Sequence, residues 1–388
     1  MRHRLLLVLF ILALTQITGW GAVGVLPVLA RHISSEFETS LSSVFVGTSM
    51  MFVAMALAAP LAGRAFRRFT TRRVMAAGAG LLGLGLCLLS TVSSLLGFWI
   101  VWALIGGAGA MFLSTAAYAW LAEYADDRAR SLIGTLMLVT GLAGSVFWPI
   151  TAFLEHLVGW RGAVLIFGVV MLLVCPLVRF GLPATRSLAS SPVVQGSGRK
   201  GPVLALLVTA IALNSFVTFG IEAVGIELLH AMGAELSSAV AVASLLGVFK
   251  VGGRVIDLLG GRRWDGMSTG LVSGAMIPLG LAAIWAGGAS LVGLGGYLVL
   301  FGIGSGAFAV ARATMPLIFY AKADYASTMS IIALPMNLIN ALAPPLLAAL
   351  LTRIGVQAVF TLMGMLSLLA FGVLLLLNMM KVRSPDAV

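Results

Sequence analysis

The chain has 388 residues, of which 60% are hydrophobic and 10% are charged, and its mean hydropathy is +1.10. This composition suits lipid and excludes a soluble globular protein, which would aggregate at such a content of apolar residues. The net charge of +11 would fit a nucleic-acid partner, but the basic residues stand in short clusters between apolar runs and form no basic, aromatic face. We therefore expect no nucleic-acid binding.

Long apolar runs separated by short polar turns predict an all-α membrane protein with twelve spanning helices. In chain order these spans are about 5–30, 40–62, 74–94, 96–121, 131–154, 161–181, 203–229, 237–259, 267–286, 290–320, 327–350 and 356–380. One long polar stretch, rich in Ser, Pro, Gly and basic residues, divides them six from six. We therefore expect an N-terminal six-helix bundle over 1–182, a cytoplasmic linker over 183–201 and a C-terminal six-helix bundle over 202–388.

The first apolar run begins after Met-Arg-His-Arg and imitates a secretory signal peptide. No small-x-small cleavage site follows and the run continues past Trp20, so we interpret it as the first retained span. If the N-terminus is cytoplasmic, most of the 24 Lys and Arg residues fall on the inner side, and Arg31, Arg161 and Arg353 fall outside. The asymmetry predicts an inner (plasma) membrane protein with both termini in the cytoplasm.

The two cysteines, Cys87 and Cys175, lie in apolar runs without a second Cys or His at ligand spacing. We therefore expect neither a disulfide nor a metal site. The chain also lacks a phosphate-binding P-loop, the His pair of zinc proteases and a nucleophile elbow. The sequence thus predicts no cofactor and no enzymatic activity.

Two internal echoes indicate that the halves are similar. A basic turn closes the second span of each half: residues 63–73 read GRAFRRFTTRR and residues 253–263 read GRVIDLLGGRR. The fourth span contains Gly106 and Gly109-Ala110, and the tenth contains Gly302 and Gly306-Ala307. Small residues at this spacing let helix backbones approach closely in lipid, so we interpret them as packing contacts and not as a nucleotide-binding loop.

The second basic turn resembles the loop between helices 8 and 9 of the major facilitator superfamily, whose pattern is Gly-x-x-x-Asp-x-x-Gly-x-Arg-Arg/Lys. The residues of this inner-turn motif are Gly253, Arg254, Asp257, Gly260, Arg262 and Arg263. The first turn keeps Gly63, Arg72 and Arg73 but has Arg67 in place of the Asp and Thr70 in place of the second Gly. The resemblance covers essentially the whole chain and implies two pseudo-symmetric bundles, transport by alternating access and a monomer.

Three charged residues stand out inside predicted spans, all in the second half: Glu222 in the seventh, Lys250 in the eighth and Arg312 in the tenth. Even on a lenient scale a charge in hydrocarbon costs about 2.5–3.5 kcal/mol, so each needs a partner or a role. In the fold that the resemblance implies, spans 1, 4, 7 and 10 line a central cavity and spans 2, 5, 8 and 11 lie beside them. All three charges then belong to the candidate substrate site.

Each charge has a functional and a structural interpretation. Arg312 is the first candidate for binding a carboxylate through two parallel hydrogen bonds, or else it is tied to Glu222 or to carbonyl groups. Lys250 is a second cationic contact, or part of an inner gate with Asp257, because the two share a helix face. Glu222 takes up a coupling proton, or merely neutralises Lys250 or Arg312.

The first half contributes neutral candidates for substrate contact, namely Gln16 and Trp20 on the first span, Ser114 and Tyr118 on the fourth, and Trp148 on the fifth. The first four form two pairs at i, i+4 spacing, so each pair shares one helix face. Tryptophan and tyrosine also lie readily against lipid headgroups, which is the alternative interpretation.

A narrower resemblance suggests the substrate. The segment Gly19-Trp20-Gly21 resembles the Gly-x-Trp-Gly-Trp stretch of monocarboxylate transporters, and Lys250 is similar to their cation in the eighth span, although the acidic residue before that glycine is missing. We expect a secondary transporter of a small, monocarboxylate-like organic anion, because Lys250 and Arg312 outweigh Glu222 by one formal charge.

The expected partners are the substrate, protons and the lipid bilayer. The alternatives are a proton-driven exporter of drugs or amphipathic metabolites, in which Glu222 contacts a cation, and a receptor or scaffold with this fold but no flux.

Overall fold

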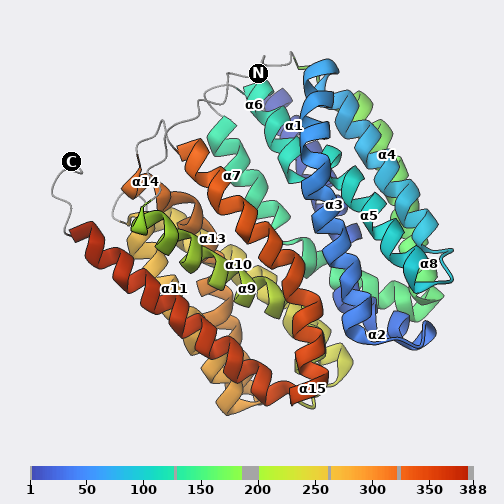
Figure 1. The fold of residues 1–388 in the computed structure, drawn as a ribbon. Helices are drawn as coiled ribbons and strands as arrows, with labels where there is room; N and C mark the ends of the chain where they lie inside the picture. Colours follow the sequence, from blue (N-terminus) through green and yellow to red (C-terminus); the bar gives the residue numbers. More distant parts are fainter. Residues whose placement is uncertain (1, 126–128, 186–200, 261–263, 321–324, 383–388) are drawn as a thin grey trace. The chain divides into compact units, whose positions relative to one another are not determined.

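The computed structural model describes residues 2–125, 129–185, 201–260, 264–320 and 325–382, and in these ranges every regular element is a helix (Figure 1). Contacts divide the chain into two compact units, Met1–Ser191 and Pro192–Val388, so the division falls inside the linker expected from the sequence. In the described ranges, ten helical segments are long and apolar enough to cross a membrane.

Unit 1 begins with four helices, α1 (Arg2–Val23), α2 (Leu26–Glu36), α3 (Leu41–Arg68) and α4 (Thr71–Leu89). It continues with α5 (Leu95–Phe112), α6 (Ser114–Ala125), α7 (Ala129–Thr140) and α8 (Ala143–Gly181). Serine hydroxyls define two of the helix starts, because Ser40 and Ser94 accept hydrogen bonds from the backbone N–H groups of Ser43 and Gly97.

Unit 2 begins with α9 (Pro202–Ala231), α10 (Leu236–Gly260), α11 (Gly266–Gly287) and α12 (Leu291–Gly296). A π-helical segment, η3 (Tyr297–Gly302), leads into α13 (Ile303–Thr314), and α14 (Pro316–Phe319) and α15 (Tyr325–Val382) complete the described part. Asp265 caps α11 by accepting a hydrogen bond from the Ser268 N–H.

Two of the ten membrane segments, 132–181 with 50 residues and 338–380 with 43, are long enough to cross a membrane twice. Each is broken at a glycine with positive φ, Gly159 at 70° and Gly355 at 79°, a backbone conformation that other residues rarely adopt. The breaks separate the expected spans 131–154 and 161–181, and 327–350 and 356–380. The ten segments therefore account for all twelve expected ranges, while the number of crossings stays a prediction.

Several of the expected spans are interrupted in the structure. The first span breaks between α1 and α2, and the fourth breaks at Leu113, whose backbone is extended. The fifth is interrupted between α7 and α8. The tenth is π-helical at its start and turns at Met315, just before Pro316, which has no N–H to continue the helix.

The expected close approach of helices at small residues is confirmed in each unit. A Cβ atom added to Gly106 of α5 would lie 2.2 Å from the carbonyl oxygen of Met51 on α3. In unit 2, a Cβ atom on Gly306 of α13 would lie 1.9 Å from the carbonyl oxygen of Lys250 on α10. Only glycine permits backbones this close, and such packing joins helices where lipid supplies no hydrophobic drive for their association.

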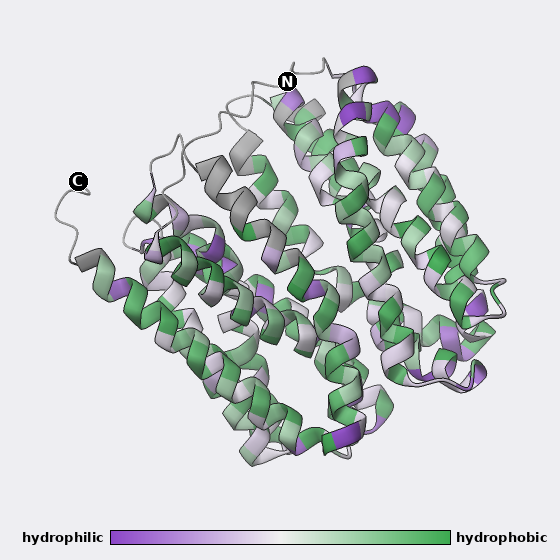
Figure 2. Cartoon of the chain, in the orientation of Figure 1, coloured by the Kyte–Doolittle hydropathy of each residue, from purple (hydrophilic) through white to green (hydrophobic). Residues whose placement is uncertain are grey.

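Hydrophobic residues run along the helices of each unit, and hydrophilic residues gather toward helix ends (Figure 2). Large apolar side chains such as Leu57, Phe180 and Leu259 are 74–80% exposed. In water such a surface would be an aggregation liability, whereas in a bilayer it is solvated by lipid tails.

Two adjacent glycines of α5 provide a test of this packing. We expect Gly106→Ala to lower the free energy of unfolding by about 1–3 kcal/mol, because the new methyl group overlaps the Met51 backbone. Gly107→Ala is the matched control, because its methyl group would meet no described atom within 4 Å, and it should gain up to about 1 kcal/mol of helix propensity. Thermal unfolding in detergent measures both, and equal shifts would contradict the packing.

Candidate functional site

An ion pair joins two helices inside unit 2. The Lys250 Nζ on α10 donates a hydrogen bond of 2.5 Å to the Glu222 Oε2 on α9. The side chains are 15% and 35% exposed, respectively, so the pair is largely removed from solvent. Both residues lie in candidate membrane spans, where each charge would be costly alone. Pairing therefore lowers the free-energy cost of placing each of these two charges in hydrocarbon.

A third group at this pair is Tyr297, which the sequence analysis missed. Tyr297 is buried at the start of η3 and interacts electrostatically with Glu222. π-Helical segments are rare and frequently mark functional sites. The sequence signal was available, since a tyrosine hydroxyl in an apolar span is a polar group in need of a polar setting, but Glu222, whose charge acts on it, is distant in sequence.

Arg312 lies on α13, less than two turns beyond Gly306, the residue that packs on the Lys250 backbone. Its side chain is half-buried, and the Nη1 atom lies 3.7 Å from the sulfur of Met336 on α15. A guanidinium beside a thioether keeps donors in a fork that matches a carboxylate. The three charged candidates, Glu222, Lys250 and Arg312, thus belong to helices that pack on one another, and their formal charges sum to +1.

Three of the neutral candidates of unit 1 donate hydrogen bonds to groups at the points where helices are interrupted. The buried Gln16 of α1 donates from Nε2 to the Phe112 carbonyl at the end of α5, over 2.9 Å. One turn further along α1, the Trp20 Nε1 donates to the Ser114 hydroxyl at the start of α6, over 2.8 Å. These two bonds span the break at Leu113.

Trp148 of α8 acts in the same way at a different break. Its indole Nε1 donates to the Gly24 carbonyl between α1 and α2, over 2.9 Å. Tyr118 is half-buried on α6, one turn after Ser114. A break in a membrane helix leaves carbonyl groups that water cannot reach, so side-chain donors replace the missing bonds. Holding these breaks is the observed contact of Gln16, Trp20 and Trp148, and a substrate contact stays a prediction.

The inner-turn motif of unit 2 is built around close contacts of α10. The Asp257 Oδ1 accepts a 2.5 Å hydrogen bond from the Thr269 hydroxyl on α11, and Gly253 approaches the Ile303 carbonyl so closely that a Cβ atom would lie 2.1 Å from it. A Cβ atom on Gly260 would overlap the ring of Trp264. Arg254 is half-buried on α10. Arg262 and Arg263 lie outside the described residues.

The corresponding turn of unit 1 makes different bonds. The Arg72 Nη1 donates to the Leu182 carbonyl over 2.9 Å, while Arg73 is exposed and Gly63 is half-buried in the last turns of α3. Beside Arg72, Glu123 of α6 accepts hydrogen bonds from Thr71 and Thr185. Unit 1 therefore fastens the residues after α8 to the start of α4, a role of Glu123 that the sequence did not reveal.

A second cluster missed by the sequence analysis ties the opposite ends of unit 1 helices. Arg161 donates two hydrogen bonds to Glu36 Oε1 and one to the Ser90 carbonyl, and the Trp160 Nε1 donates to Glu36 Oε2. The guanidinium also lies 4.4 Å from the Trp160 ring centre. In the ranges that the structure describes, no group of three or more His, Cys, Asp or Glu side chains is arranged to hold a metal ion.

We compared the chain with models of known protein families, and the result fits its helical architecture. The family model of the Major Facilitator Superfamily matches residues 8–297, which is well over half of the sequence. The chain belongs to the major facilitator superfamily, a family of multi-pass membrane transporters. A small-molecule substrate and membrane lipid are the partners that this family implies.

The curated relatives that match include three monocarboxylate transporters, each 28% identical to the chain in the matched part. Monocarboxylate transporter 13 of Bos taurus matches over 189 residues, or 47% of this chain and 44% of the relative. Monocarboxylate transporter 2 of Rattus norvegicus matches over 200 residues, 50% and 40%, and monocarboxylate transporter 11 of Mus musculus over 151 residues, 39% and 33%. The matched part spans less than half the length of each of these relatives.

Solved structures of transporters share the fold across nearly the whole chain. A bacterial homologue of the human lysosomal transporter Spinster has a TM-score of 0.77 at 17% identity, covering 98% of both chains. The nucleoside transporter NupG, as a D323A mutant, has a TM-score of 0.77 at 14% identity, covering 95% of this chain and 98% of its own. The human organic anion transporter MFSD10 has a TM-score of 0.65 at 18% identity, covering 95% and 99%. At these identities the likeness shows the fold alone.

The ion pair predicts a specific pattern of stability in a double-mutant cycle. Glu222→Gln and Lys250→Met each leave one charge without its partner, and each should lower the unfolding temperature; the cost should stay below the about 3–5 kcal/mol of a fully buried pair, because Glu222 is one-third exposed. The double variant should be more stable than the sum of the single losses predicts. Additive losses in thermal unfolding would show that the two side chains do not interact.

Proposed function

We propose that this transporter is a secondary active transporter that moves a small, monocarboxylate-like organic anion by alternating access, together with a proton. The observation that carries the proposal is the charge arrangement of unit 2, in which Glu222 and Lys250 neutralise one another and Arg312 adds a cation on a helix that packs against the Lys250 backbone. A net positive site in hydrocarbon favours an anionic ligand, which would compensate that charge.

The substrate carboxylate binds Arg312 through two parallel N–H···O bonds in this proposal. It then competes with Glu222 for Lys250, since an ammonium group bonded to one carboxylate can turn to another. A carboxyl group that loses its cation in an apolar setting binds a proton more readily, so Glu222 takes up the proton that travels with the anion. The empty site and the fully loaded site therefore carry the same formal charge, because the negative charge of the anion is balanced by the proton on Glu222.

The monocarboxylate transporters among the matching relatives support a carboxylate substrate, although each matches the chain over only part of its length. The excess of Lys and Arg on one side of the expected membrane supports placement in the inner (plasma) membrane with both termini in the cytoplasm. We further propose that the protein acts as a monomer, as its superfamily membership suggests.

The alternative is a proton-driven exporter of drugs or amphipathic metabolites, with Glu222 as the contact for a cationic substrate. In the structure Lys250 occupies that carboxylate, which favours the anion. Uptake into proteoliposomes, challenged with a panel of small carboxylates and of lipophilic cations, distinguishes the two. Competition by carboxylates alone supports the anion transporter, and competition by cations alone supports the exporter.

Arg312→Gln tests the substrate contact. Removing the guanidinium should reduce carboxylate uptake to the background of empty liposomes, because the remaining amide cannot form the charged two-bond contact. Arg31→Gln is the control for charge, since Arg31 is exposed on α2 of unit 1 and should leave uptake unchanged. Both variants must insert into the membrane and elute from a size-exclusion column in the same way as the wild type. Wild-type uptake by a folded Arg312→Gln protein would remove Arg312 from the site.

Glu222→Gln tests the proton. The variant should still exchange substrate across a membrane at equal pH on both sides, but an imposed proton gradient should no longer drive accumulation, since the amide cannot take up a proton. Glu235→Gln, an exposed carboxylate between α9 and α10, is the matched control and should keep gradient-driven accumulation. Unchanged pH dependence in Glu222→Gln would place the coupling elsewhere.

A further inference from the structure

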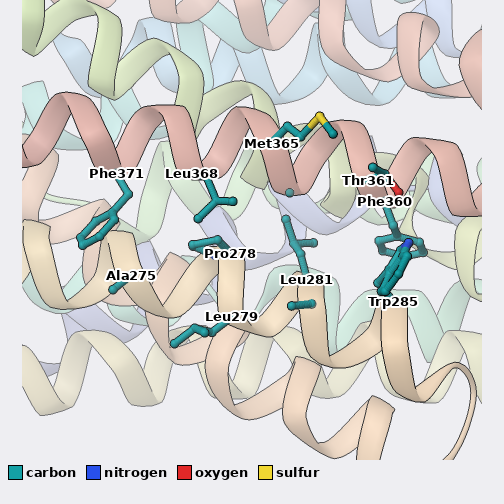
Figure 3. A pocket seen from close by; sticks show the side chains of 12 residues that line it. Ala275, Pro278, Leu279, Leu281, Trp285, Phe360, Thr361, Met365, Leu368 and Phe371 are labelled. Carbon is teal, nitrogen blue, oxygen red and sulfur yellow. The ribbon is translucent and has the colours of Figure 1, made fainter.

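A groove of about 530 Å³ lies between α11 and the second segment of α15, both in unit 2 (Figure 3). Its volume falls in the range of about 300–1,000 Å³ that is typical of ligand sites. The α11 side is formed by residues from Ala275 to Trp285, and the α15 side by residues from Phe360 to Phe371. None of the charged candidates discussed above lines it, so it is separate from the proposed substrate site.

The lining of the groove is almost wholly hydrocarbon. Leucine, phenylalanine, methionine, proline, alanine and glycine make up most of it, with Trp285 and Thr361 at one end. The Thr361 hydroxyl already donates a 2.9 Å hydrogen bond to the Gln357 carbonyl. The groove therefore offers a hydrophilic ligand few groups for hydrogen bonding, whereas burial of a hydrocarbon chain against these side chains is favourable.

The groove is continuous with the membrane-facing surface. Leu279, Met365 and Leu368 line it and are each 56–63% exposed, although they belong to segments that cross the membrane. Such side chains are covered by lipid tails in a bilayer. Hydrocarbon chains thus lie at the mouth of the groove, and one enters it without any movement of the helices.

The length and the ends of the groove match one lipid leaflet. The helical rise from Ala275 to Trp285 is about 15 Å, which is half of the about 30 Å hydrocarbon core. Figure 3 shows Ala275 and Phe371 together at one end, and Trp285 and Thr361 together at the other. Tryptophan prefers the membrane interface, and Trp285 stands two residues before α11 ends.

A cation is available at the Trp285 end. Arg353 is exposed and stands two residues before the break at Gly355, from which the second segment of α15 runs toward Phe360. The topology therefore places Arg353 at the interfacial end of the groove, where a phosphate group would be complementary in charge. The opposite end, at Ala275 and Phe371, is purely apolar.

We propose that the groove between α11 and α15 binds one phospholipid, with an acyl chain along the groove, its methyl end at Ala275 and Phe371, and its phosphate at the end marked by Trp285 and Arg353. The bound chain fills a hollow that small side chains create. At Gly364 an added Cβ atom would meet no described atom within 4 Å, so the position faces open space in the groove. A retained lipid of this kind would stabilise unit 2 by mass action.

Gly364→Leu is the decisive variant, because its side chain would occupy space in the groove and its Cβ atom meets no described atom within 4 Å. Gly372→Leu is the matched control, since Gly372 lies two turns further along α15, does not line the groove, and an added Cβ atom there likewise meets no described atom within 4 Å. The full chain is exchanged into detergent, supplied with phosphatidylglycerol carrying two 16-carbon chains, and weighed intact by native mass spectrometry.

We expect the wild type and Gly372→Leu to retain one phospholipid per chain, and Gly364→Leu to retain at least about tenfold less. Added phosphatidylglycerol should raise the unfolding temperature of the first two proteins only. Ala282→Leu, on the α11 side, replaces Gly364→Leu if the latter does not fold.

Three results would overturn the proposal. The first is equal lipid retention in all variants, and the second is retention of free detergent or fatty acid as readily as of phospholipid. The third is the mass of a protein dimer, which would mean that a second copy of the protein covers the groove.

Discussion

The chemistry of unit 2 depends on one backbone contact, the approach of Gly306 on α13 to the carbonyl oxygen of Lys250 on α10. A side chain at position 306 would push the helices apart, and with them the anchor point of the lysine. Because the contact fixes the Lys250 backbone, its ammonium group reaches Glu222 on α9. The same contact sets the height of Arg312, which lies less than two turns further along α13. Packing of two small surfaces thus positions three charges.

Unit 1 repeats the packing and not the charge. Gly106 approaches the Met51 carbonyl of α3 much as Gly306 approaches the carbonyl of Lys250. The neutral donors of unit 1, Gln16 and Trp148, bind carbonyl groups at helix breaks. Duplication has preserved the helix contact, which lipid requires in both halves, while the three charged candidates for the substrate site, Glu222, Lys250 and Arg312, belong to unit 2.

The sequence predicted most of what depends on local pattern. Hydropathy located the apolar segments, and small residues located the close helix contacts at Gly106 and Gly306. It failed where a partner is distant in sequence: the break at Leu113 is unmarked by proline or glycine and is held by Gln16 and Trp20, 96 and 94 positions away from their partners. Glu36 and Glu123 were missed for the same reason, because their bonds close only in three dimensions.

The three charged candidates, Glu222, Lys250 and Arg312, all belong to unit 2, which has a consequence for the alternating access that we propose. An ion pair shared between units would have to break and re-form in each cycle, and each unpaired charge would cost several kcal/mol while exposed to a low dielectric. Glu222 and Lys250 both belong to unit 2, so a relative movement of the units leaves their bond intact. In the mechanism that we propose, the pair opens when a carboxylate competes for Lys250, so the coupling of proton to substrate would be set by ligand chemistry instead of by the conformational change itself.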